Sequence, residues 1–411
     1  MKGVLRLFKP DNQNHNLLQT PTGVGDTLPE RLEKYRSLES QVMNTFKLWS
    51  YDEVAVPFIE YPDMFSVHKG KTIERQMFQF NDETGRPVVL RPDFTPSVAR
   101  LVAKYYNQHP LPLRLCYSGK VFRSGHDSMT AEKELYQVGV ELVGGEAPYG
   151  DAELVAMAAE TLENIGIDDF VICIGNLQFV NKLLESLEVN GELGHQIMEA
   201  LNENNLVKYY QIVKGMETSE EKRELLKDLT KFRGGKENVQ MVREMTNLPQ
   251  VEDILAELET IFDILEGYDL QDRVTFDLSL VRRRDYYTGF IMEGYSSKLG
   301  FPLCGGGRYD NLMINYGMDL PATGFAFSFD SLAKLVPEKM LPTRTPKVCI
   351  SYEWEVKDSA LAKAAELRKN GKRVFVQLAE NDRKTAKEQG KQQGVDEFYY
   401  ISGQDEFYEQ L

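Results

Sequence analysis

Hydrophobic positions recur along the chain with helical spacing in some stretches and with strand-like spacing in others. Each change of spacing marks the boundary of an expected element. Helical spacing runs from Pro29 to Trp49 and returns over 95–106 and 150–167, where Asp151 is placed to cap the helix start. Strand-like runs cover 51–65, ending near Pro57, then the hairpin 76–93. Two long apolar runs, 113–122 and 135–144, are expected to be neighbouring strands joined by a loop. The first third of the chain therefore predicts a mixed arrangement of strands and helices.

The second half of the chain changes character twice. A buried strand at 170–175 is followed by helical patterns from about 177 to 265, and strand patterns then return at 273–281. After the proline-containing linker 337–346, two strand-like runs, a helix and a last strand make a separate small pattern. We therefore expect a core domain over 1–335 with a helical insertion at about 177–265, and a small truncated α/β domain over 346–411.

Composition narrows the class of protein. The 411 residues carry 48 basic and 63 acidic side chains, a net charge of −15, which opposes a phosphate-tracking surface and hence a nucleic-acid partner. No segment is apolar enough to span a membrane, and the start of the chain does not fit a signal peptide, so no membrane partner and a cytoplasmic location are expected. The four cysteines show no zinc spacing, and neither a metal nor a cofactor is predicted.

Several polar residues fall where an apolar sheet core is expected. A buried charge is costly unless it is paired, so each needs a structural partner or a polar ligand. Taken singly, each is better explained as a structural salt bridge or a strand-end residue, and only the whole set favours a binding site. The set is Arg91, Asp93, Arg123, Gln137, Glu141, Arg282, Tyr286 and Tyr287.

The segment CGGGRYD (304–310) invites comparison with a phosphate-binding loop. It matches neither GxxxxGK[ST] nor GxGxxG, so neither nucleotide fingerprint applies. Its three glycines allow a close backbone approach, either to a ligand or to a neighbouring strand.

The strings TGVGDTLPE, VAVPFIEYPDMF, LRPDFTPSVAR, LVRRRDYYTGF and GGGRYDNL occur in the order found in a known family. Over about residues 20–335 the chain resembles the catalytic core of histidyl-tRNA synthetase, and LVRRRDYY is similar to that family's LVRGLDYY signature. The resemblance implies an α+β fold: a class II aminoacyl-tRNA synthetase-like antiparallel sheet flanked by helices, with the helical insertion and the small C-terminal α/β domain.

The resemblance also implies a histidine site. Asp93, at a position usually held by glutamate, and Thr95 match residues at the α-amino group, and Arg123 matches the arginine near the carboxylate. Gln137 and Glu141 match the residues that hold the amino group and the imidazole. The remaining matches are the histidine-specific Arg282 and the pocket tyrosines Tyr286 and Tyr287.

The ATP half of the synthetase pattern is missing. Gly125, Ala131 and Ser331 stand where the family has a glutamate and two phosphate-clamping arginines. Loss of cationic clamps removes the electrostatic stabilisation that adenylation requires. This combination resembles the regulatory subunits of ATP phosphoribosyltransferase, which implies a non-catalytic chain without a catalytic residue.

That family implies specific partners. They are a short-form ATP phosphoribosyltransferase catalytic subunit in a hetero-octamer, a homodimer through the synthetase-like core, and L-histidine as a feedback effector. Two alternatives stay open, a divergent histidyl-tRNA synthetase and a non-catalytic RNA-binding module.

Overall fold

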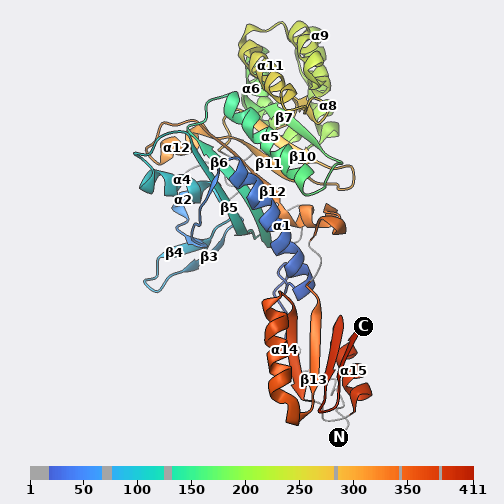
Figure 1. The fold of residues 1–411 in the computed structure, drawn as a ribbon. Helices are drawn as coiled ribbons and strands as arrows, with labels where there is room; N and C mark the ends of the chain where they lie inside the picture. Colours follow the sequence, from blue (N-terminus) through green and yellow to red (C-terminus); the bar gives the residue numbers. More distant parts are fainter. Residues whose placement is uncertain (1–17, 67–75, 125–131, 282–285, 342–344, 379–381) are drawn as a thin grey trace. The chain divides into compact units, whose positions relative to one another are not determined.

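The computed structural model describes residues 18–66, 76–124, 132–281, 286–341, 345–378 and 382–411. The chain divides into two compact units, Met1–Leu341 and Pro342–Leu411 (Figure 1). Each unit has hydrophobic clusters of its own.

A nine-stranded sheet forms the centre of the larger unit, in the order β1-β5-β6-β12-β11-β10-β7-β9-β8. Only the β1–β5 and β7–β9 pairs are parallel, so the sheet is mostly antiparallel. The strands are β1 (Asp52–Glu53), β5 (Leu113–Phe122), β6 (Glu134–Val143), β7 (Val171–Asn176), β8 (Arg233–Gly234), β9 (Val274–Asp277), β10 (Phe290–Tyr295), β11 (Cys304–Arg308) and β12 (Ala322–Ser328).

A second sheet contains β2 (Ile59–Glu60), β4 (Pro87–Leu90) and β3 (Phe78–Asn81), in that order. The expected hairpin at 76–93 is confirmed as β3 and β4, whose turn is closed by Asp82. The single strand expected up to Pro57 is wrong. Proline lacks an N–H for a strand ladder, and the chain instead forms the short β1 and β2 on either side of it, in different sheets.

Helices cover both faces of the large sheet. On one face, α1 (Pro29–Leu48) and α5 (Tyr149–Asn164) pack against each other and over β6 and β12, as Figure 1 shows. This face carries the largest apolar cluster, which includes Val138 and Val140 of β6 and Val42 of α1. The opposite face packs against α4 (Thr95–Tyr105) and α12 (Asp310–Asn315), and includes Tyr117 of β5. Two further helices are α2 (Asp63–Ser66) and α13 (Phe329–Leu335).

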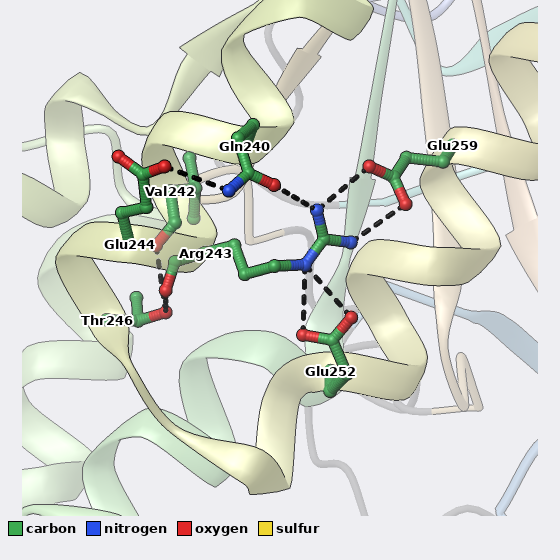
Figure 2. Close-up of polar contacts among 7 residues, drawn as sticks. All are labelled: Gln240, Val242, Arg243, Glu244, Thr246, Glu252 and Glu259. Carbon is green, nitrogen blue, oxygen red and sulfur yellow. Dashed lines mark hydrogen bonds and ion pairs between the residues drawn. The ribbon is translucent and has the colours of Figure 1, made fainter.

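The insertion between β7 and β9 is helical, as the sequence predicts. Figure 1 shows α6, α8, α9 and α11 gathered at one end of the large sheet. Its helices are α6 (Leu177–Ser186), α7 (Gly191–Asn202), α8 (Leu206–Gly215), α9 (Glu220–Asp228), α10 (Val239–Thr246) and α11 (Glu252–Glu266). Arg243 of α10 ties the last two together, because its guanidinium binds the carboxylates of Glu252 and Glu259 of α11 (Figure 2).

Replacing Arg243 by methionine should lower the free energy of unfolding by about 0.5–1 kcal/mol, and the loss should shrink in 1 M salt. The Arg243 side chain is a quarter exposed, and ion pairs screened by solvent contribute little even when bidentate. Urea unfolding at low and high salt measures this effect. A loss above about 2 kcal/mol that is independent of salt would show that packing, not charge, holds α10 to α11.

The smaller unit is a four-stranded sheet with one helix on each face. Its strands are β14 (Arg373–Leu378), β13 (Lys347–Tyr352), β15 (Glu397–Ile401) and β16 (Glu406–Gln410), in that order. Alternate residues of β13 face opposite sides, so Ile350 packs near Ala364 of α14 (Lys357–Lys369), and Cys349 packs near Ala386 of α15 (Arg383–Gln392).

Candidate functional site

Glu141 is a carboxylate buried in the middle of the large sheet. It lies on β6 with only 1% of its surface exposed, on the face opposite Val140 and Leu142. Thr95 Oγ1 donates to Glu141 Oε1 at 2.8 Å, and the Tyr309 hydroxyl donates to Oε2. Burial raises the pKa of Glu141 to about 8, against the effect of these two hydrogen bonds. The side chain therefore takes up a proton more readily than an ordinary carboxyl group does.

Asp93 is a second buried acid, at the turn between β4 and α4. Its Oδ1 accepts from the Phe94 amide at 2.8 Å, and its Oδ2 accepts from the Tyr286 hydroxyl at 2.9 Å. The negative charge of Asp93 adds to the burial that raises the pKa of Glu141, so the two acids face a common region. A cationic ligand placed between them would relieve this repulsion.

Two neighbouring side chains extend the region along β6. Gln137 stands four residues before Glu141 on the same face of the strand, opposite Ser328 of β12. Within the described ranges, the buried Gln137 Oε1 accepts no hydrogen bond from the protein. Arg123 comes close from the loop after β5, where its Nε donates to the Pro92 carbonyl at 3.0 Å. A buried acceptor without a protein donor calls for a partner such as water, an ion or a ligand.

Aromatic rings contact the two acids and one another. The rings of Tyr286 and Tyr287 meet edge to face at 5.1 Å between centroids, and Tyr286 meets Tyr309 in the same way at 6.0 Å. Tyr309 and Tyr117 are site residues that the sequence did not indicate. Tyr117 stacks on Phe94 at 4.2 Å, and its hydroxyl lowers the pKa of Glu141 by a hydrogen bond.

The structure thus brings Asp93, Thr95, Arg123, Gln137, Glu141, Tyr286 and Tyr287 to one face of the large sheet. Arg282 lies outside the described residues, as do Gly125 and Ala131 of the loop after β5. The histidine-binding roles of all these residues stay predictions.

Ser331 is the residue that the resemblance places where the synthetases have a phosphate-clamping arginine. Ser331 is buried at the start of α13, and its Oγ donates to Ser328 Oγ at 2.8 Å. The neighbouring Asp330 accepts a hydrogen bond from the Tyr35 hydroxyl at 2.5 Å, on α1. Position 331 is therefore closed into the junction between β12 and α13 and carries no positive charge toward a phosphate.

The glycines at 304–310 let neighbouring strands of the large sheet approach closely. A Cβ on Gly306 would lie 2.3 Å from the Gly324 carbonyl oxygen, and one on Gly307 would lie 2.6 Å from that of Phe290. Of the two readings left open for this segment, the close approach to neighbouring strands is the one observed. A Cβ on Gly324 itself would lie 2.0 Å from Glu141 Oε2, so this glycine makes room for the buried acid.

Asp151 forms a buried ion pair with Arg308, at the end of β11. The sequence led us to expect Asp151 as a helix cap, but α5 begins at Tyr149 without a side-chain cap. Instead, both Asp151 oxygens accept from the Arg308 guanidinium, at 3.1 and 3.0 Å, and both residues are buried. Burial raises the pKa of Asp151 to about 6, and the bidentate arginine keeps the carboxylate ionised at neutral pH.

Among the described residues, no group of three or more His, Cys, Asp or Glu side chains could hold a metal ion. Nor does any helix there combine the length and the apolar character that crossing a membrane requires.

Comparison with known proteins shows the family to which the chain belongs. A family model described as histidyl-tRNA synthetase matches residues 23–332. The ATP phosphoribosyltransferase regulatory subunit of Halalkalibacterium halodurans is 33% identical over 88% of this chain and 91% of its own length. The protein of that name from Desulforamulus reducens is 34% identical over 92% of this chain and 94% of its own.

A solved structure agrees with these sequence relatives. It is described as an ATP phosphoribosyltransferase regulatory subunit/histidyl-tRNA synthetase from Bacillus halodurans C, with 31% identity and a TM-score of 0.85, covering 94% of this chain and 99% of that one. The class II synthetase-like fold expected from the sequence is confirmed. The chain belongs to the family of ATP phosphoribosyltransferase regulatory subunits, a branch of the histidyl-tRNA synthetase-like proteins.

Proposed function

We propose that this chain is the non-catalytic subunit that a short-form ATP phosphoribosyltransferase needs for activity, in the first step of histidine biosynthesis. The observation that carries the proposal is the family membership joined to the loss of the nucleotide clamp. Ser331 occupies the position of a synthetase arginine and is hydrogen-bonded within its own strand–helix junction. A chain that keeps the fold but lacks this cation has little means of stabilising a transferring phosphate.

The ligand that best suits the pocket is L-histidine, acting as feedback inhibitor. Its α-ammonium group has three donors, for which Asp93 and the Gln137 Oε1 are acceptors. Its imidazole needs an acceptor fixed against an N–H, which Glu141 provides, and its carboxylate suits the guanidinium of Arg123. The ring would lie among Tyr286, Tyr287 and Tyr309.

We further propose that the chain forms a homodimer, and that two dimers join four catalytic subunits in a hetero-octamer. The small three-stranded sheet and its flanks expose Phe58, Ile59, Tyr61 and Phe80, an apolar set that a monomer would leave in water. Replacing Ile59 by aspartate should give a monomer in sedimentation measurements, and a variant that stays a dimer would place the interface elsewhere.

Co-expression with a short-form catalytic subunit tests the function. The two chains should co-purify, and the transferase activity should depend on this chain. L-Histidine should reduce that activity through a coupling free energy of about 1–3 kcal/mol, or roughly 5- to 150-fold. Arg282→Ala should remove inhibition but leave activation. A catalytic subunit that is equally active alone would refute the proposal.

The rival function is that of a divergent histidyl-tRNA synthetase. It requires histidine-dependent exchange of pyrophosphate with ATP, which we expect to be absent because Ser331 offers no cation. Exchange above the background without enzyme would favour this rival. An RNA-binding module is tested by filter binding, where a strong salt dependence would support it.

A further inference from the structure

Arg91 is a buried cation without a carboxylate partner in the described part of the chain. It comes at the end of β4 with 2% of its surface exposed, and burial lowers its pKa to about 10. Among the described residues, its guanidinium donates to main-chain carbonyls only: to Val56 at 2.7 Å, to Lys120 at 2.9 Å and to Pro57 at 3.3 Å. The charge of Glu60 acts on Arg91 without a direct ion pair and raises its pKa, against the larger effect of burial. A buried cation without a direct ion pair is costly to keep, so its position calls for a reason beyond stability.

Two aromatic rings hold the guanidinium from either side. Its central carbon lies 4.4 Å from the ring centroid of Phe58 and 3.9 Å from that of Phe94. Phe58 is 54% exposed, so one side of this sandwich belongs to the surface. Gly119 makes room for the arrangement, because a Cβ there would lie 2.9 Å from an Arg91 nitrogen.

From Arg91, contacts lead to both acids of the pocket. The Arg91 amide donates to the Phe58 carbonyl, and its own carbonyl accepts from the Phe122 amide, which fixes the start of the turn that carries Asp93. Phe94 next to Asp93 stacks on Tyr117, whose hydroxyl bonds to Glu141. Displacing the guanidinium would release Phe94, and with it the support of each acid.

We propose that Arg91 is a positioning residue of the amino-acid pocket, which sets Asp93 directly along the chain and Glu141 through the Phe94–Tyr117 stack. Its contact with Phe58 joins the exposed apolar surface of the small sheet to the pocket. This role rests on the proposed histidine site for the identity of the ligand. The contacts of Arg91 with Phe58 and Phe94 are present without a ligand.

The first test compares Arg91→Lys with Arg100→Lys. Arg100 lies nearby on α4 and pairs with Glu60 at 2.8 Å, so the same substitution there is a matched control. By calorimetry, Arg91→Lys should weaken L-histidine binding at least 10-fold, while Arg100→Lys should change it less than 2-fold. An equal loss in both variants, or none in Arg91→Lys, would overturn the proposal.

Phe58→Leu tests the same role of Arg91 in case Arg91→Lys does not fold. Leucine keeps an apolar side chain on the surface proposed for the dimer, so the melting temperature should stay nearly unchanged, yet the variant loses one aromatic face of the sandwich and should weaken binding about 3-fold. If Arg91→Lys fails to fold and Phe58→Leu binds as the unchanged protein does, the positioning role is wrong.

Hydrogen exchange without ligand separates this inference from the proposed function. Arg91→Lys should speed amide exchange in peptides covering 91–98, where the Phe94 amide is bonded to Asp93, and Arg100→Lys should not. If the unchanged protein binds no L-histidine, the proposed histidine site is wrong. The exchange rates of Arg91→Lys still test whether Arg91 positions Asp93. Unchanged exchange in Arg91→Lys would refute it.

Discussion

Replacing Arg308 by methionine should destabilise the larger unit by about 3–5 kcal/mol at pH 8, because it leaves a buried carboxylate without its cation. Both oxygens of Asp151 bond to this arginine, which also donates to the Gly145 carbonyl at 3.0 Å. The midpoint of urea unfolding, at constant slope, measures the loss. Arg36→Met serves as the control, since the Arg36 side chain is 70% exposed where it pairs with Glu39, and it should cost less than about 1 kcal/mol.

The cost of Arg308→Met should also depend on pH. Burial already raises the pKa of Asp151 to about 6, and removing the arginine raises it further. At pH 5 the lone carboxyl is protonated and neutral, so the destabilisation should shrink there. A double variant, Arg308→Met with Asp151→Leu, should recover much of the stability, because an apolar pair replaces the ion pair. A loss below about 1 kcal/mol at pH 8 would show that the buried pair contributes little.

Local patterns in the sequence predict the elements well where an element is long. The twenty-residue helix α1 begins and ends within one residue of its expected bounds, and the hairpin of β3 and β4 lies within 76–93. The patterns fail where short pieces are set by tertiary contacts. β1 and β2 have two residues each, too few for a period of two to be seen.

The site was accessible to sequence reasoning only in part. Asp93 and Tyr286 are 193 positions apart, and Glu141 and Tyr309 are 168 apart, so no local pattern joins them. Resemblance to a family supplied most of the set. Tyr309 follows three glycines that resemble a phosphate loop, and Tyr117 lies on an apolar strand, where a tyrosine is typical of a core, so neither position indicates a site by itself.

The buried acid Glu141 should make the stability of the larger unit depend on pH. Its pKa is raised from 4.5 to about 8, first of all by burial. The folded chain therefore holds a proton that the unfolded chain releases above pH 4.5, and stability falls as the pH rises toward 8. One pKa unit corresponds to about 1.4 kcal/mol, so the loss over this window is at most about 5 kcal/mol.

Glu141→Gln should remove this loss, since a glutamine of the same shape stays neutral at every pH. The variant should match the unchanged protein near pH 5 and become more stable than it by several kcal/mol, on the order of 3–5, at pH 8 to 9. Urea unfolding from pH 5 to 9 gives the comparison. The same variant should bind L-histidine at least 10-fold more weakly, because the imidazole loses its carboxylate partner.

Glu39→Gln is the control of opposite sign. Burial acts to raise the pKa of Glu39, but hydrogen bonds from Ser118, Tyr136 and Arg36 outweigh it and lower the pKa. Its ionised form thus stabilises the fold above pH 4.5, and that contribution disappears in acid. Glu39→Gln should therefore cost stability at pH 8. If both variants lose stability at pH 8, Glu141 is a structural acid held ionised by its hydroxyl partners. If only Glu39→Gln does, the protein keeps Glu141 at a cost in stability, as expected of a residue retained for a ligand.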